Sequence, residues 1–158
     1  MKTDITELIN KTIQLAAKNV KKKKCGPFAA IVIKDGKIVS SAYNRVTLTN
    51  DPTAHAEVEA IRKASKKLKT FDLSGCEIFS SCQPCPMCLS AIYWAKIKRI
   101  YCCADKKTAA KYGFRDEMIL KELRKNDKNQ KVKLIFVENN NKELPFETWE
   151  KLPGKKKY

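Results

Sequence analysis

One histidine, one glutamate and two cysteines of this chain have the types and the spacing that suit metal-assisted hydrolysis. The first two lie in His55-Ala56-Glu57, and the cysteines lie in Pro84-Cys85-Pro86-Met87-Cys88. One imidazole and two thiolates give a zinc ion three protein ligands and leave its fourth tetrahedral position for water, which is the arrangement of a catalytic site. We therefore predict one Zn²⁺ per chain, bound by His55, Cys85 and Cys88.

Glu57 follows the predicted histidine ligand by two positions, so that it lies near the metal without binding it. A carboxylate in that place can carry protons between an activated water and a substrate, as a general base and then a general acid. We predict that Glu57 is the catalytic residue.

The two cysteines are three residues apart at a predicted helix start, which places both sulfurs on one side of the helix. Free amide hydrogens at a helix N-terminus stabilise thiolates, and Pro86 suits the first helical position. Together with Cys82 they also form C-x-x-C-x-x-C, so a redox pair or part of an iron–sulfur ligand run stays open. The upstream histidine and glutamate favour catalytic zinc over these sites and over a structural metal.

Hydrophobic periodicity predicts the elements that must position these side chains. Helical spacing predicts a first helix from Ile5 to about Val20, and an Asp35-Gly36 turn predicts a hairpin of two strands over 28–33 and 37–43. The later predicted elements are a helix capped by Asp51 and running from Pro52 to Leu68, a strand over 76–81, a helix over 86–96, a strand over 99–104, a helix over 115–125, a strand over 132–137 and a helix over 145–152.

Strands that alternate with helices predict an α/β fold. We expect a three-layer α/β/α sandwich around a mixed five-stranded sheet, largely parallel after its opening antiparallel hairpin. Because no linker or internal repeat divides the chain, residues 1–158 are predicted to form a single domain.

Lysine dominates the charge of the chain, whose 158 residues carry a formal net charge of +16 at pH 7. Such a charge raises nucleic acid as a partner. The cations are mostly lysines, in runs such as 21–24 and 155–157, whereas readers of bases and phosphates favour arginine. A solvated lysine surface is therefore favoured over a nucleic-acid partner.

Neither a long apolar run nor the basic and then apolar layout of a signal peptide is present in the sequence. We therefore expect a cytoplasmic protein with no membrane partner. Five of the seven cysteines are not assigned to the metal, and we expect them to be reduced and mostly structural: Cys25, Cys76, Cys82, Cys102 and Cys103.

The H-x-E and P-C-x-x-C segments match the pattern of zinc-dependent base deaminases. Longer stretches resemble bacterial guanine deaminases, of the cytidine deaminase-like superfamily: NDPTAHAEV at 50–58, CQPCPMCLSAIYWA at 82–95, GPF at 26–28, GF at 113–114 followed by Asp116, and the terminal KKY. This resemblance runs nearly end to end. The zinc pattern is common to the superfamily, whereas Ile92-Tyr93-Trp94, Asp116 and the terminal tyrosine favour the guanine branch.

The resemblance implies hydrolytic deamination of guanine, a small purine, to xanthine and ammonia. It implies a homodimer whose C-terminal segments, from about 139 to 158, are exchanged so that each tail closes the partner's pocket. It also implies substrate-binding roles: Phe28 and Trp94 as walls for the purine, Asn44 and Asp116 as its polar readers, Ala56 as a backbone contact, and Tyr158 as a lid. By residue type alone these would be core aromatics, a turn residue, a helix cap and a solvated terminus.

Two residues depart from the family pattern. Gln83 stands where the superfamily usually has glutamate, and Arg115 stands where guanine deaminases tend to have a second aspartate before Asp116. Arg115 would place a cation beside the expected base reader, which could alter its pKa or the preferred substrate.

The sequence leaves other substrates open. A transfer-RNA adenosine deaminase is one alternative, and a deaminase of cytosine, cytidine, guanosine or an aminotriazine is another. A catalytically silent zinc-containing RNA-binding module is disfavoured, because binding alone has no use for the proton-carrying Glu57.

Overall fold

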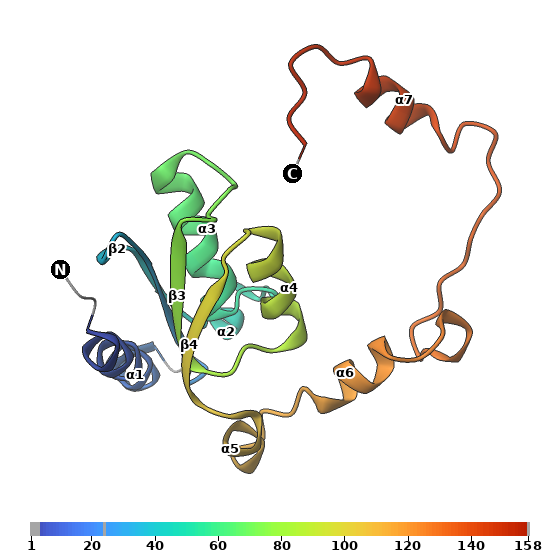
Figure 1. The fold of residues 1–158 in the computed structure, drawn as a ribbon. Coiled ribbons are helices and arrows are strands. Elements are labelled where there is room, and N and C mark those ends of the chain that lie inside the picture. Colours follow the sequence, from blue (N-terminus) through green and yellow to red (C-terminus); the bar gives the residue numbers. More distant parts are fainter. Residues whose placement is uncertain (1–3, 24, 158) are drawn as a thin grey trace. The chain divides into compact units, whose positions relative to one another are not determined.

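The computed structural model describes residues 4–23 and 25–157, and the chain divides at Asp116 into two compact units (Figure 1). In the first unit the elements are α1 (Ile5–Lys23), β1 (Ala29–Lys34), β2 (Lys37–Tyr43), α2 (Val46–Thr49), α3 (Ala56–Leu68), β3 (Cys76–Cys82), α4 (Pro86–Trp94), β4 (Arg99–Ala104) and α5 (Lys106–Lys111). In the second they are α6 (Glu117–Leu123), a 3-10 turn over Asp127–Asn129 and α7 (Leu144–Glu150).

The sheet is mixed, as predicted, and its strand order is β2-β1-β3-β4. β1 pairs antiparallel with both β2 and β3, and only β3 and β4 are parallel neighbours. The expectation of a largely parallel sheet was therefore wrong. The connection through α3 carries the chain from β2 across β1, so β2 and β3 run in the same direction without being neighbours.

The predicted hairpin turn is confirmed, because Asp35 and Gly36 have φ of 50° and 72°. Positive φ at both central residues is the geometry of a type I′ turn, whose twist matches that of the two strands.

Side chains alternate along the strands and fill a core on each face of the sheet. On one face Ala30, Val32 and Ile78 belong to a buried cluster with α3 and α4, and on the other Ile31 and Phe79 pack with α1. The predicted three layers are thus confirmed for the first unit. Ala60 and Ala64 of α3 have no exposed surface, so this helix lies close against the sheet.

Helix α3 begins at Ala56 and not at Pro52, so the predicted cap at Asp51 was wrong. The Asp51 carboxylate accepts hydrogen bonds from the backbone N–H and the hydroxyl of Thr53, at 2.8 and 2.7 Å. This local turn competes with helix formation. His55 therefore precedes the helix, with an extended φ of −70° and ψ of 155°, and Glu57 lies in the first turn.

The predicted fifth strand over 132–137 is not formed in the described chain, and the sheet has four strands. The segment has high strand propensity, but its apolar side chains are exposed, with Ile135 at 82% and Phe136 at 87%. Propensity alone does not hold a strand, because the backbone needs a hydrogen-bonded neighbour. The short helices α2 and α5 were not predicted.

The outer edge of β2 is protected by two lysines. Lys63 and Lys67, one turn apart on α3, donate from Nζ to the carbonyls of Ser41 and Val39, at 3.2 and 3.1 Å. Charged side chains at an edge strand oppose pairing with another chain. The opposite edge of the described sheet is β4.

No helix in the described part of the chain is long and apolar enough to cross a membrane. All seven cysteines are free, including the five that were expected to be reduced and are not assigned to the metal. Cys25, Cys76 and Cys82 are buried, whereas Cys102 and Cys103 on β4 are exposed and so are not core residues.

Candidate active site

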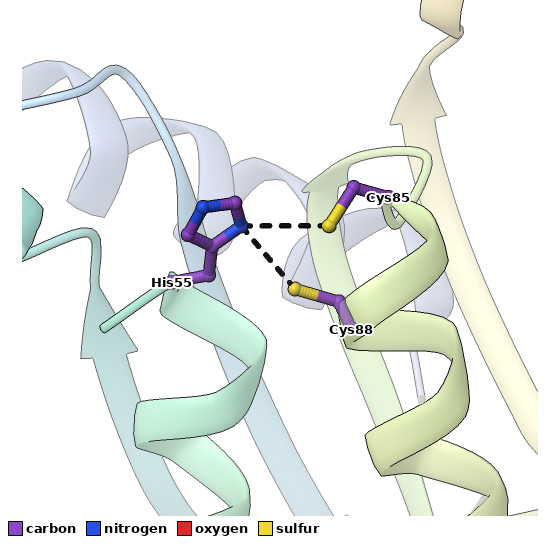
Figure 2. A group of neighbouring side chains, drawn as sticks. All are labelled: His55, Cys85 and Cys88. Carbon is purple, nitrogen blue, oxygen red and sulfur yellow. Dashed lines mark hydrogen bonds between the residues drawn. The ribbon is translucent and has the colours of Figure 1, made fainter. Parts of the chain in front are cut away.

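The structure brings together the imidazole and the two thiols that were predicted to bind metal (Figure 2). His55 directly precedes α3, Cys85 precedes α4, and Cys88 lies in the first turn of α4. The Nδ1 atom of His55 lies 3.5 Å from Sγ of Cys85 and 3.4 Å from Sγ of Cys88. Two helix starts far apart in sequence therefore form one cluster.

The separations within this cluster suit a zinc ion. With Zn–N of about 2.0–2.1 Å and Zn–S of about 2.3 Å, a tetrahedral centre requires about 3.6 Å between nitrogen and sulfur ligands. The observed distances are close to this value, and the ligand atoms all lie within 4.8 Å of one another. One imidazole and two thiols are also the soft and borderline donors that zinc prefers.

The two thiols differ in acidity. The pKa of Cys85 is lowered to about 4, and the largest cause is a hydrogen bond from the Cys88 side chain. Burial opposes this shift, and a hydrogen bond with His55 adds to it. The same hydrogen bond with Cys85, together with burial, raises the pKa of Cys88. The hydrogen bond with Cys85 raises the pKa of His55. Metal binding at this cluster must therefore release protons.

Glu57 is buried beside the cluster, with 5% of its surface exposed. Its Oε1 accepts a 2.7 Å hydrogen bond from the hydroxyl of Ser80, which has no exposed surface. Its charge and a hydrogen bond with it are among the causes of the raised pKa of Cys88, so the carboxylate lies near that thiol. A buried carboxylate held by one hydroxyl is oriented for proton transfer.

The sequence interpretation missed Ser80. A signal for it was available, since strand alternation places Ser80 on the same face as the core residue Ile78. A polar residue at a core position of a strand requires a buried partner.

Phe28 and Asn44 lie next to each other at the β1–β2 end of the sheet. The Asn44 backbone N–H donates to the Phe28 carbonyl at 2.9 Å, and the Asn44 side chain is buried, with Oδ1 accepting from the N–H of Val46 at 3.2 Å. A Cβ atom at Gly26 would lie 3.1 Å from the Asn44 side chain. The Phe28 ring packs edge-on against Phe114, with 4.9 Å between ring centroids.

The cation paired with Asp116 is Lys106 and not the neighbouring Arg115. The Lys106 Nζ lies 3.3 Å from the carboxylate, and the two side chains are 25% and 19% exposed. Asp105 caps α5 by accepting from Thr108 N–H at 2.7 Å, which sets Lys106 as the first residue of that helix. The sequence interpretation contained no signal for this pair, because α5 itself was not predicted.

The structure describes two of the remaining predicted substrate contacts, Ala56 and Trp94, and leaves out the third. Ala56 is fully buried between the histidine and the glutamate. Trp94 is 65% exposed and ends α4, a helix of nine residues or about 13 Å, so it lies at the other end from Cys85. Tyr158 lies outside the described residues. The substrate roles of these residues stay predictions.

Residues 2–104 match the family model of the cytidine and deoxycytidylate deaminase zinc-binding region. The chain is similar to the guanine deaminase of Bacillus subtilis (strain 168), with 42% identity over 150 residues that cover 95% of this chain and 96% of the relative. A crystal structure of a Bacillus subtilis guanine deaminase superposes with a TM-score of 0.93 at 41% identity, covering 97% of this chain and 98% of the other.

Other relatives match a smaller part of the chain. A guanine deaminase from Nitrosomonas europaea has a TM-score of 0.66 at 31% identity, over 69% of this chain and 63% of the other. A tRNA-specific adenosine deaminase from Aquifex aeolicus (strain VF5) is 44% identical over 82 residues, which are 51% of this chain and 54% of the relative.

We predict that Cys85→Ala and Cys88→Ala chains lose zinc, because each removes one of three ligand atoms. Zinc per chain measured on purified, dialysed protein should fall well below the parental value of about one, because two protein ligands hold the ion far more weakly than three. Cys25→Ala removes a buried thiol outside the cluster and serves as the control. Full zinc occupancy in either ligand variant would overturn the assignment.

Proposed function

Since the chain belongs to the family of deaminases with the cytidine and deoxycytidylate deaminase zinc-binding region, we propose that it deaminates guanine hydrolytically to xanthine and ammonia. The observation that carries this proposal is the His55, Cys85 and Cys88 cluster with the buried carboxylate of Glu57 beside it. Near-full-length similarity to a guanine deaminase supports guanine as the substrate.

We propose that His55, Cys85 and Cys88 hold one zinc ion. When bound, the ion lowers the pKa of water from 15.7 toward about 7 and supplies a nucleophile at neutral pH. Because only three protein groups would hold the ion, it would stay open to that water.

Glu57 moves the protons in this reaction. It accepts a proton from the attacking water and delivers it to ring N3 as the C2–O bond forms. It then takes the proton of the new C2 hydroxyl and delivers it to the amine, so that C2=O forms as the C2–N bond breaks, since ammonia leaves far more readily than an amide anion. The Ser80 hydroxyl holds Oε1, which orients the carboxylate for these transfers.

We propose that Phe28, Asn44 and Asp116 recognise the purine, with the backbone of Ala56 beside them. Asp116 accepts N–H groups, and guanine presents ring and exocyclic N–H groups where a pyrimidine nucleoside presents a different edge. Lys106 keeps this carboxylate paired and in place. Trp94 and Tyr158 complete the pocket in the family arrangement that the sequence resembles.

A homodimer with exchanged C-terminal segments is also proposed. In the described part of the second unit no residue is buried, although it carries the apolar run 132–137. A second copy of the chain would cover the apolar run 132–137. The run would pair with β4 of that copy, because lysines cover the other outer strand, β2. The exchanged part would then begin near Glu117, earlier than the 139 suggested by the sequence.

A transfer-RNA adenosine deaminase is the second candidate, favoured by the family's zinc pattern and the net charge of +16. Such an enzyme must hold a nucleic acid with the target base extruded. The tRNA deaminase compared above matches only about half of the chain, which favours guanine.

We predict that the purified protein releases ammonia and forms xanthine from guanine. The panel comprises guanine, guanosine, adenine, cytosine, cytidine, an aminotriazine and tRNA, with ammonia measured for each. Guanine should exceed every other member by at least about tenfold in kcat/KM, because a site built to pair with N–H groups rejects analogues that lack them. Inosine in tRNA with no xanthine from guanine would reverse the choice.

We predict that Glu57→Gln lowers kcat by about 10²- to 10⁴-fold while zinc content stays unchanged, because it removes the general acid and base and keeps the shape of the side chain. Ser80→Ala should lower kcat less, since it removes only the hydrogen bond that orients Glu57. Turnover of Glu57→Gln within threefold of the parent would refute the catalytic role.

We predict that deleting Tyr158 sharply reduces guanine turnover and leaves zinc content and dimerisation intact, because the pocket loses its lid. With exchanged tails, mixing this chain with Glu57→Ala should restore about a quarter of parental activity, since half of the dimers are mixed and each has one complete site. Unchanged kinetics after deletion would dispose of the lid, and a verified heterodimer without activity would argue against the exchange.

A further inference from the structure

A second glutamate on the first turn of α3 has no part in the chemistry described above. Glu59 lies two residues after Glu57, and its side chain is 13% exposed. Each of its carboxylate oxygens faces an arginine: Oε1 lies 2.9 Å from Nη1 of Arg62, and Oε2 lies 3.5 Å from Nη1 of Arg45. One largely buried anion thus joins two cations from different segments.

The Arg45 partner belongs to the segment that carries the proposed base reader. Arg45 directly follows Asn44, and its backbone N–H donates to the Ala54 carbonyl at 2.9 Å. The Arg45 side chain then returns to Glu59 on α3. The Asn44 segment is therefore tied through Arg45 to the chain just before His55 by a backbone bond, and to α3 by an ion pair.

The Arg62 partner reaches the turn that leads into the proposed histidine ligand. From α3, Arg62 lies 3.8 Å from Oδ2 of Asp51 and donates to the Thr53 hydroxyl at 3.4 Å. The Asp51–Thr53 turn continues into His55, whose N–H donates to the Thr53 carbonyl at 2.7 Å. Arg62 therefore holds the outer side of the turn that sets the position of His55.

We propose that Glu59 is a positioning residue, which couples the Asn44 segment to the His55 turn through Arg45 and Arg62. Isolated exposed ion pairs contribute little to stability. Here, however, the carboxylate is mostly buried and bound on both oxygens, so its loss leaves two arginines without their shared anion. Groups that surround a metal ligand or a substrate-binding residue act by holding that residue in place. Small displacements of such a residue reduce metal affinity or catalytic rate.

This proposal rests on the zinc site for its metal part and on guanine deamination for its kinetic part, so the two parts are measured separately. Glu59→Gln keeps the shape of the side chain and removes its charge. We expect its zinc to pass to a competing chelator about tenfold faster, the low end of the effect of changing groups behind a metal ligand. We expect the KM for guanine to rise severalfold, with kcat within about threefold of the parent.

The two arms of the network can be separated by single variants. Arg62→Met should speed zinc release and leave the KM near the parental value, because it frees the His55 turn. Arg45→Met should raise the KM and leave zinc release near the parental rate, because it frees the Asn44 segment. These side chains are 53% and 41% exposed, so both variants are expected to fold even if Glu59→Gln does not.

Glu77→Gln is the matched control. Glu77 is 18% exposed and pairs with Arg99, but it lies at the start of β3, outside the network. If the loss of any ion pair were enough, Glu59→Gln and Glu77→Gln would change zinc release and KM alike. The proposal expects Glu77→Gln to behave as the parent. If Glu59→Gln, or both arginine variants, match Glu77→Gln in zinc release and KM, the proposal is overturned. If the parent does not act on guanine, the zinc measurement still decides it.

Discussion

The site depends on one geometric constraint. Two helices on the same face of the sheet begin at the same end of its strands. β2 and β3 are both antiparallel to β1, so they run in the same direction and their carboxyl ends lie at the same end of the sheet. The segments after them lead into α3 and α4, and both helices pack on the face that contains Ala30 and Val32. Their starts therefore meet, and ligand chemistry at the carboxyl ends of like-directed strands follows the general rule for α/β sheets.

Charge around the site is organised by pairing rather than by net charge. The chain is strongly basic, yet the three carboxylates that the site analysis singles out have specific partners: Ser80 for Glu57, Lys106 for Asp116, and two arginines for Glu59. Buried or half-buried anions require such partners, because a low dielectric penalises an isolated charge. The remaining lysines are mostly solvated, and two of them, Lys63 and Lys67, cover a sheet edge.

Sequence reasoning succeeded where the information is local. Spacing of three residues puts Cys85 and Cys88 on one side of a helix, and Asp35-Gly36 between two apolar runs favours a tight hairpin turn. It failed where two local structures competed, as at Asp51, whose short side chain caps a turn as readily as a helix. It failed also over 132–137, where strand propensity is high but a strand exists only with a neighbour.

The sequence by itself determined the chemistry available to this protein, because the donor atoms of one histidine and two cysteines, and the nearby glutamate, are set by residue type and short spacing. Tertiary structure decided which distant groups support them. Ser80 lies 23 residues from Glu57, Lys106 at the start of α5 pairs with Asp116 beyond the end of that helix, and Arg45 meets Glu59 from another segment. Such contacts depend on strand order and helix direction, which arise from burial over the whole sheet rather than from any short stretch of residues.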